Sequence, residues 1–133
     1  MAKTLIAFFS RRGENWVDGS VRFLPKGNNE VIVEKIKAQL PEADVFQIDT
    51  IYIGWPCWWG TLPMCMFTFI EKHDWTGKTV VPFTTHEGSG FGSGLRDLRA
   101  AVKGATVAKG LSLRGTAARS SDTQIEKFVA GGK

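Results

Sequence analysis

The sequence predicts a single α/β domain in which a parallel β-sheet lies between two layers of helices. Apolar runs of strand length alternate along the chain with segments of helical pattern, which is the order that produces parallel strands covered by helices. The strand-like runs are apolar throughout, as is typical of strands that are buried on both faces. With 133 residues, 43% of them hydrophobic, the chain can build one core but not two.

The first predicted strand is the apolar run at residues 3–9. Residues 13–28 contain three glycines and one proline and predict a loop, whose length in a strand-to-helix connection suggests a function. A helix is expected over residues 30–40, with Asn28 and Asn29 as capping residues. Its inward side chains are expected to be Val33, Ile36 and Leu40.

Two short strands are predicted next, at residues 43–48 and 50–54, with only Asp49 between them. A proline suits the first turn of a helix, so a helix is expected over residues 63–72. Because its apolar residues lie nearly all round the helix, it should be buried. Another strand follows at residues 78–83, although Pro82 lacks the N–H that a strand interior uses. The remaining elements are expected to be a glycine-rich loop at 84–92, a helix at 93–102, a strand at 106–113 and a helix at 121–129.

A cluster of tryptophans occupies the turn that follows the strand at residues 50–54. Trp55, Trp58 and Trp59 lie there together with two prolines and two glycines. Each indole carries about 150–250 Å² of mostly apolar surface, so a turn seldom contains three. We interpret the cluster as a wall for a planar ligand, while the alternative is that one or two of the rings cap the core.

Three unusual loops, at residues 10–29, 55–62 and 84–92, each follow a predicted strand. In an open parallel sheet all of them lie at the carboxyl edge, where such folds bind ligands. In the first loop, the Ser10 hydroxyl, the guanidinium of Arg11 or Arg12, and the free N–H groups of the following helix form a candidate phosphate site. The chain contains neither a Walker A motif nor G-x-G-x-x-G.

Composition excludes several classes of protein and leaves one question open. No apolar stretch is long enough for a membrane span or a secretory signal, so a soluble cytoplasmic protein is expected. Cys57 and Cys65 have no partners at metal-ligand spacing and are expected to be reduced thiols. Residues 89–133 carry 8 Lys and Arg against 3 Asp and Glu, whereas residues 1–88 carry 9 against 10. The basic third is either a solvated face or a docking surface, but no nucleic-acid motif accompanies it.

Four segments together resemble the flavodoxin-like FMN-binding proteins, in particular the subfamily with a G-Y-P-x-W-W-G loop. The resemblance covers nearly the whole chain in order. It implies a flavodoxin-like three-layer α/β/α sandwich with a five-stranded parallel sheet of order 2-1-3-4-5. The segments are Ser10-Arg-Arg-Gly, Gly27-Asn-Asn-Glu30, Gly54-Trp-Pro-Cys-Trp-Trp-Gly60 and Thr84-Thr-His-Glu-Gly-Ser-Gly90.

The resemblance also implies a cofactor, FMN, and the residues that bind it. The first loop and helix start would hold the phosphate, the tryptophan loop one side of the ring, and the 84–92 loop its other edge. The family often has G-N-T where this chain has Gly27-Asn28-Asn29, so one phosphate-binding hydroxyl is missing, and Asn29 is expected to replace it through its amide or its backbone N–H. The expected cofactor-binding residues are Ser10, Arg11, Arg12, Asn28, Asn29, Pro56, Cys57, Trp58, Trp59, Gly60, Thr84, Thr85, His86, Glu87, Gly88 and Gly90.

The function implied by the resemblance is electron transfer, in one of two forms. The protein is either a one-electron carrier that docks with a redox partner protein, or a small NAD(P)H-dependent reductase of quinone-type acceptors. A flavin-free α/β interaction module is the alternative of a different class. Serine hydrolysis is disfavoured because G-x-S-x-G is not matched and neither His73 nor His86 has a triad partner by spacing.

The expected strand order conflicts with the direct Asp49–Thr50 bond. In the order 2-1-3-4-5, the strands at 43–48 and 50–54 are parallel and separated by the first strand. The chain must then recross about five residues of strand and step sideways by two strand spacings, roughly 19 Å in all. A parallel crossover normally takes a dozen or more residues. We therefore expect that a crossover segment is missing from this sequence near Asp49 and Thr50. The alternative is one continuous strand over residues 44–54, which would remove the second strand of the expected order.

Overall fold

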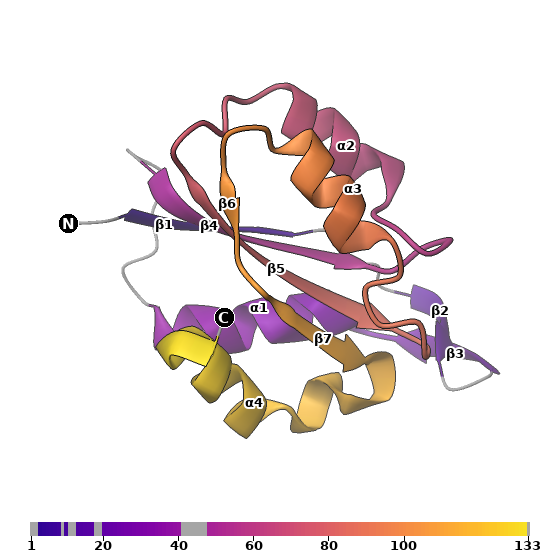
Figure 1. Ribbon diagram of the computed structural model, residues 1–133. Helices are drawn as coiled ribbons and strands as arrows, with labels where there is room; N and C mark the ends of the chain where they lie inside the picture. The colour runs from indigo at the N-terminus through magenta and orange to yellow at the C-terminus, as the bar shows by residue number, and fades with distance from the viewer. Residues whose placement is uncertain (1–2, 9, 11–12, 18–19, 41–47, 133) are drawn as a thin grey trace.

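The structure is a three-layer α/β/α sandwich (Figure 1). Two helices, α2 (Met64–Glu71) and α3 (Gly94–Ala101), cover one face of the sheet. The other face carries α1 (Asn28–Gln39) and α4 (Asp122–Lys127). The predicted fold class is thus confirmed. This computed structural model describes residues 3–8, 10, 13–17, 20–40 and 48–132, with the backbone alone for 3–5, 13–17, 48–49 and 132.

All strand pairs of the central sheet are parallel. Three strands, β1 (Lys3–Phe8), β4 (Ile48–Pro56) and β5 (Thr79–His86), lie side by side in that order. Two further strands, β6 (Thr106–Val107) and β7 (Leu111–Arg114), both pair with the far side of β5. In the predicted order 2-1-3-4-5, β1 is strand 1, β4 is strand 3 and β5 is strand 4. The last predicted strand is divided into β6 and β7.

The strand predicted at residues 43–48 lies outside the described residues, except for Ile48, which belongs to β4. β4 runs through Asp49 and Thr50 as one strand, so the strand boundary predicted there is wrong. Its pairing with β1 is irregular at this point, because Lys3 pairs with Ile48 and Thr4 with Thr50, which leaves Asp49 without a partner in the register. A single Asp does not end a strand whose flanking residues are apolar or β-branched.

A β-hairpin occupies most of the region predicted as a loop. β2 (Gly13–Val17) pairs antiparallel with β3 (Ser20–Leu24). The sequence contains two signals that favour this hairpin, the apolar alternation of Val21 and Phe23 and the Asp18-Gly19 dipeptide between the strands. The loop prediction was wrong because it relied on the glycines and the proline instead of the period of two.

Helix α1 begins two residues earlier than predicted. Gly27 is its N-cap, with an extended backbone and no capping side chain, so Asn28 and Asn29 are not caps but members of the first turn. This shift turns Asn29 inward, onto the same face as Ile32 and Ile36, because residues three and four apart share one side of a helix. Val33 and Leu40, which were predicted to face the core, are only partly buried.

The helices after β4 are confirmed with small differences. α2 is not buried all round, since Met64 is 76% exposed while Met66 and Ile70 lie in the core. A 3₁₀ helix, η1 (Gly115–Ser120), precedes α4, and a π-helical turn, η2 (Phe128–Gly132), follows it. Neither was predicted, because such short helices have no periodic apolar pattern. None of the helices in the described part of the chain combines the length and apolarity that crossing a bilayer requires.

Pro82 lies in the interior of β5, and its missing N–H does not cost the sheet a hydrogen bond. Val80 and Pro82 direct their backbone groups to the same side of β5, where the carbonyl of Val80 accepts a hydrogen bond from Ala108. β6 pairs with β5 only up to Val80 and β7 only from Phe83 onward. The missing N–H of Pro82 therefore faces the gap between these strands, where no ladder bond is required.

The alternation of side chains along β4 and β5 supplies a core on each face of the sheet. Ile51, Ile53 and Val80 face α2 and α3, whereas Tyr52 and Val81 face α1 and α4, and all five are at most 2% exposed. Two-sided burial explains why the predicted strands are apolar throughout. The sheet is therefore a rigid base, and the loops at its carboxyl edge are held in place by packing on both faces.

Candidate functional site

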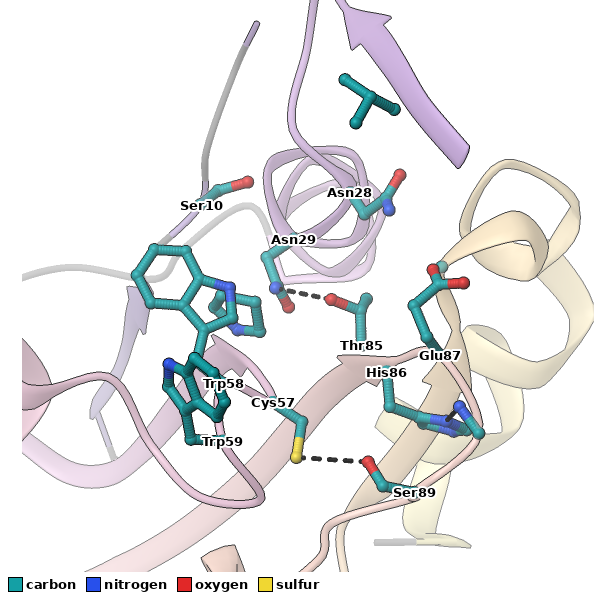
Figure 2. Close-up of a pocket in the computed structure, with 14 residues that line it drawn as sticks. Ser10, Asn28, Asn29, Cys57, Trp58, Trp59, Thr85, His86, Glu87 and Ser89 are labelled. Carbon is teal, nitrogen blue, oxygen red and sulfur yellow. Dashed lines mark hydrogen bonds between the residues drawn. The ribbon is translucent and has the colours of Figure 1, made fainter. Parts of the chain in front are cut away.

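A cavity of about 770 Å³ lies at the carboxyl edge of the sheet. The ends of β4 and β5, the start of α1 and the hairpin enclose it (Figure 2). These segments are far apart in sequence, and they meet because parallel strands end at the same edge. The residues that line it are Ser10, Val21, Asn28, Asn29, Pro56, Cys57, Trp58, Trp59, Thr85, His86, Glu87, Gly88, Ser89 and Gly115.

Trp58 and Trp59 form one wall of the cavity (Figure 2). They belong to a two-residue turn in which Trp58 and Thr61 exchange two backbone hydrogen bonds of 3.1 Å. The central residues, Trp59 and Gly60, have φ angles of 52° and 80°, the left-handed values of a type I′ turn. Trp59 is 102% exposed and Trp58 38% exposed, so the turn presents one fully exposed and one partly exposed indole.

The tryptophan turn is anchored to the start of α3. The Gly60 carbonyl accepts hydrogen bonds from the Ser93 N–H at 2.7 Å and from the Ser93 hydroxyl at 3.1 Å. The Asp97 carboxylate accepts from the hydroxyls of Thr61 at 2.6 Å and Ser93 at 3.1 Å. A Cβ on Gly92 would lie 2.4 Å from the Gly60 carbonyl oxygen, so only glycine allows this approach.

Trp55 does not belong to the wall that the sequence analysis assigned to three indoles. Its side chain is fully buried in the core between β4 and α3, where it packs against Phe91 and Gly94. Thr84 faces the same interior, because its hydroxyl donates to the Trp55 carbonyl at 2.6 Å. Both residues lie next to cavity residues in the chain, and strand alternation turns them to the opposite face.

The start of α1 forms a polar end of the cavity. The Ser10 hydroxyl accepts a hydrogen bond from the Glu30 N–H at 3.2 Å, which places Ser10 over the first helical turn. The Asn28 carbonyl oxygen accepts from the Arg119 guanidinium at 2.8 Å. The Asn29 amide nitrogen donates to the Thr85 hydroxyl oxygen at 3.0 Å. A helix start that carries amide side chains is suited to an anionic group.

The loop after β5 forms the wall opposite the tryptophans (Figure 2). The His86 Nδ1 accepts a hydrogen bond from the Gly88 N–H at 2.9 Å, and Arg114 donates to the Glu87 carbonyl at 2.9 Å. Partial burial, and then the nearby Arg114 charge, lower the pKa of His86, while Glu87 opposes the shift. A neutral ring whose Nδ1 accepts carries its proton on Nε2.

Cys57, in the segment of the tryptophan wall, contacts both β5 and the loop that follows it. The Ser89 hydroxyl lies 3.4 Å from the Cys57 sulfur, and the Cys57 N–H donates to the Thr85 carbonyl at 2.8 Å. The position of the tryptophan turn is therefore tied both to β5 and to the loop that follows it.

Eleven of the residues expected from the sequence line the cavity. Gly60, Thr84 and Gly90 do not line it, because Gly60 faces Ser93 and Thr84 faces the core. Arg11 and Arg12 lie outside the described residues. The expected residues that line the cavity are Ser10, Asn28, Asn29, Pro56, Cys57, Trp58, Trp59, Thr85, His86, Glu87 and Gly88.

Three lining residues were missed. Ser89 lies inside the glycine-rich loop at 84–92, so the loop was identified although this residue was not. Gly115 directly follows β7, and the rule that ligands bind at strand ends applies to it as well. Val21 comes from β3 and could have been found only after the hairpin was recognised from its alternation.

The arrangement has the features of a site for a ligand with a flat ring system and an anionic end. Two indoles and the 86–89 loop face each other across the cavity, and the helix start with two amides lies at one end. Aromatic side chains bury planar ligands effectively, and helix starts stabilise phosphate. Within the described part of the cavity, the hydroxyls of Ser10, Thr85 and Ser89 are hydrogen-bonded to Glu30, Asn29 and Cys57.

Solved structures of similar fold are flavodoxins. The chain is 22% identical to oxidised flavodoxin 2 from Bacillus cereus, with a TM-score of 0.65 over 97% of this chain and 99% of that one. It is 16% identical to a flavodoxin from Fusobacterium nucleatum that was crystallised with flavin mononucleotide, with a TM-score of 0.66 over 96% of this chain and 95% of that one. At these identities the likeness establishes the fold.

Comparison of sequences identifies the family as well as the fold. No curated protein matches the chain in sequence. The family model described as Flavodoxin matches residues 15–130, which include most of the hairpin, the tryptophan turn and the loop after β5. This match covers far more than half of the chain, and the protein therefore belongs to the flavodoxin family.

Proposed function

We propose that this protein binds FMN in the cavity at the carboxyl edge and transfers electrons through it. The observation that carries the proposal is that one cavity of about 770 Å³ combines a wall of two indoles, a polar loop opposite them and a helix start. These three features match the ring, the ring edge and the phosphate of FMN. The Fusobacterium nucleatum flavodoxin, which has a similar fold, was crystallised with this cofactor.

The residues present fit the cofactor. Asn29 is 1% exposed, and its carbonyl oxygen has no hydrogen-bond partner among the described residues, although it lines the cavity. A buried polar atom without a partner is rare in a folded protein, so a ligand that completes its bonding is expected there. Ser10, Asn28 and the N–H groups in the first turn of α1 would hold the phosphate. A hydroxyl group of the cofactor would donate to the Asn29 carbonyl oxygen, and Trp58 and Trp59 would cover the ring.

Bound FMN supplies the redox chemistry, and the side chains position it. The indoles exclude water from one side of the ring. His86, with its proton on Nε2, offers a donor to the ring edge, and the Gly88 N–H fixes that tautomer. Arg114 donates a hydrogen bond to the Glu87 carbonyl, which ties the loop after β5 to the end of β7.

The visible spectrum of the purified protein tests the proposal. We expect a yellow protein with flavin absorbance, or an apoprotein that quenches the fluorescence of added FMN with a one-to-one endpoint. A colourless protein that leaves FMN fluorescence unchanged would overturn the proposal and favour a flavin-free interaction module. Riboflavin and FAD, titrated in parallel, test whether the site takes the mononucleotide.

The charge of the protein favours a second candidate, a small NAD(P)H-dependent reductase of quinone-type acceptors. The net charge of +4 is the sum of +5 over residues 89–133 and −1 over residues 1–88. A basic surface attracts an anionic dinucleotide as well as an acidic redox partner. Anaerobic mixing with NADPH or NADH separates the two forms, because a reductase loses its flavin absorbance rapidly whereas a carrier keeps it until a partner reductase is added.

A further inference from the structure

The tryptophan turn leaves apolar surface exposed beside the cavity. Trp59 is 102% exposed, and Met64, the first residue of α2, is 76% exposed. A flavin in the cavity can cover only one face of the Trp59 indole, so the other face would stay exposed in the loaded protein. Aromatic residues, methionine and arginine are enriched where proteins contact one another. The exposed pair therefore offers an apolar contact to another protein.

Basic side chains of α3 lie beside this apolar pair. Arg96 is connected to the tryptophan turn, because its guanidinium lies 3.3 Å from the Asp97 carboxylate, which accepts from the Thr61 hydroxyl at 2.6 Å. The Arg96 side chain is nevertheless 80% exposed. Arg99 and Lys103 follow at helical spacing, and both are exposed. Neither forms a salt bridge with any described residue, so their charges are not neutralised by the described part of the protein.

The apolar pair and the basic row share one face of the molecule. Helices that connect parallel strands begin where the strands end, so α2 and α3 both start at the carboxyl edge, next to the cavity. The two helices lie side by side over the same face of the sheet (Figure 1). Each contains one acidic residue. Glu71 lies at the far end of α2, and Asp97 is hydrogen-bonded within the network of the tryptophan turn. The part of this face nearest the cavity is therefore apolar and basic.

We propose that an acidic one-electron redox protein docks on this face. The docking surface consists of Trp59, Met64, Arg96, Arg99 and Lys103. The basic row attracts and orients the partner, and the apolar pair excludes water at the contact beside the flavin. One electron leaves the reduced metal centre of the partner, which is oxidised, and enters the flavin, which is reduced, and no covalent bond forms or breaks. This inference rests on the proposed function and names the class of its partner.

Other occupants fit this surface less well. A second copy of the chain would place the basic row against itself in a two-fold symmetric contact, where like charges repel. Peripheral membrane binding usually uses a helix whose apolar side faces outward, whereas the apolar side of α3, which includes Leu98, faces the core. Transient redox complexes, in contrast, form through small contact areas, so a few exposed side chains suffice.

The test uses two probe proteins of opposite charge, an acidic plant-type [2Fe–2S] ferredoxin and the basic mitochondrial cytochrome c. NMR titration of the ¹⁵N-labelled protein, with and without FMN, measures both the affinity and the site of binding. We expect ferredoxin to shift the amide signals of Trp59, Met64 and Arg96, and its affinity to fall about tenfold between roughly 20 mM and 200 mM salt. Cytochrome c should not bind. Anaerobic mixing with reduced ferredoxin should reduce the bound flavin at a rate with the same dependence on salt.

Charge reversal locates the surface. We expect Arg99→Glu and Lys103→Glu each to weaken ferredoxin binding about threefold to tenfold and to reduce its dependence on salt. Lys127→Glu makes the same change of charge on α4, on the opposite face of the sheet, and as the matched control should weaken binding less than about twofold. Met64→Gln tests the apolar contact and should weaken binding about threefold at every salt concentration. The affinity for FMN should not change in any of these variants.

The outcomes keep this inference apart from the proposed function. A protein that binds no FMN overturns the proposed function, and the electron transfer with it. A protein that binds FMN but not ferredoxin overturns the inference alone, as do equal losses in Arg99→Glu and Lys127→Glu. Preferential binding of cytochrome c would also contradict it. If Met64→Gln dissociates a dimer, or if Arg99→Glu abolishes sedimentation with vesicles of phosphatidylserine and phosphatidylcholine while ferredoxin does not bind, the surface belongs to a second copy or to a membrane, and the inference is wrong.

Discussion

The backbone of Trp59 has a conformation that residues with large side chains seldom adopt, and its indole buries almost no surface within the protein. A φ of 52° in the left-handed region costs of order 1–2 kcal/mol for a non-glycine residue. The indole is also 102% exposed, so burial of this side chain contributes nothing to the stability of the folded protein. Such a combination is typical of a residue that serves a ligand, since strained positions concentrate at functional sites.

The indoles supply the first prediction at this scale. Trp58→Ala and Trp59→Ala should each weaken FMN binding by about 1–3 kcal/mol, the scale of aromatic contact and apolar burial. Trp59→Ala should leave the free energy of unfolding of the apoprotein nearly unchanged, because the ring is fully exposed. Fluorescence titration and urea denaturation measure the two quantities.

Trp55→Ala is the matched control, since Trp55 is an indole from the same segment that lies in the core. It should lower the free energy of unfolding by about 3–5 kcal/mol, as other large-to-small core changes do. Unchanged FMN affinity in both Trp58→Ala and Trp59→Ala would remove the assignment of this wall to the flavin ring.

His86 supplies a pH-dependent prediction. Burial and the Arg114 charge hold its pKa below the ordinary value, so the ring is neutral in the folded protein down to a lower pH than in the unfolded chain. The stability that this difference contributes is fully present above the unfolded pKa of about 6.5 and is lost as the pH falls through the folded pKa. Protonation also removes the acceptor for the Gly88 N–H, so the loop after β5 should loosen in the same range.

An NMR titration of the His86 ring measures this pKa, with His73→Gln removing the other histidine signal. Arg114→Gln should raise the pKa, because it removes a repelling charge, and Glu87→Gln should lower it further. A His86 midpoint in the folded protein equal to that in denaturant would contradict the assignment.

At the scale of elements, the tryptophan turn depends on α3. Thr61 and Ser93 both donate to Asp97, and Ser93 also holds the Gly60 carbonyl, so one carboxylate connects the turn to the helix. The hydrogen bond from Thr61 is the main cause that lowers the pKa of Asp97, with Ser93 and Arg96 adding to it and partial burial opposing it. The network contributes stability above the unfolded pKa of Asp97 and loses it as the pH falls through the lower folded value.

Asp97→Ala should therefore release the turn without unfolding the domain. We expect faster amide exchange at Trp58 and Thr61, whose N–H groups lie in or beside the turn, together with weaker FMN binding. Thr61→Val should produce the same effect, and the double variant should add little, because both changes break one network. Asp122→Ala, which removes an exposed carboxylate that pairs with Lys35 on another face, is the control. Exchange rates that respond equally to Asp97→Ala and Asp122→Ala would show that the network does not hold the turn.

At the scale of the whole molecule, the described residues contain one strand fewer in the central sheet than the order expected for the fold. The described sheet has β1, β4 and β5 adjacent, and β4 is continuous through Asp49 and Thr50. A strand on the far side of β1, followed by a parallel return to β4, needs a crossover of a dozen or more residues. The irregular pairing at Asp49 lies where that crossover would join.

We accordingly predict that the protein made in its natural source carries an additional segment near Asp49 and Thr50. Its intact mass should exceed 14.7 kDa by the mass of at least about a dozen residues. Mass spectrometry of the intact protein and of the peptide spanning residues 48–51 measures this directly. A mass of 14.7 kDa together with an unbroken peptide would contradict the prediction.

Much of the fold was predictable because its signals are local. The apolar runs of β1, β4 and β5 and the positions of α2 and α3 follow from patterns within a few residues of one another. Strand direction alone placed the three loops at the carboxyl edge, and the family resemblance named the site residues, of which eleven line one cavity. The hairpin was missed although its alternation is local, since its glycines and proline were given more weight than its period of two.

The sequence by itself thus determined the layers, the edge at which the site lies and the chemical classes of its lining residues. Only the tertiary structure decided which side chains face the cavity, because that choice depends on contacts between residues far apart in the chain. Trp55 and Trp58 belong to one short segment, yet packing against α3 buries one, and the turn held by Ser93 exposes the other. In the same way the orientation of the Asn28 amide depends on Arg119, 91 residues away, and no local pattern records a contact at that separation.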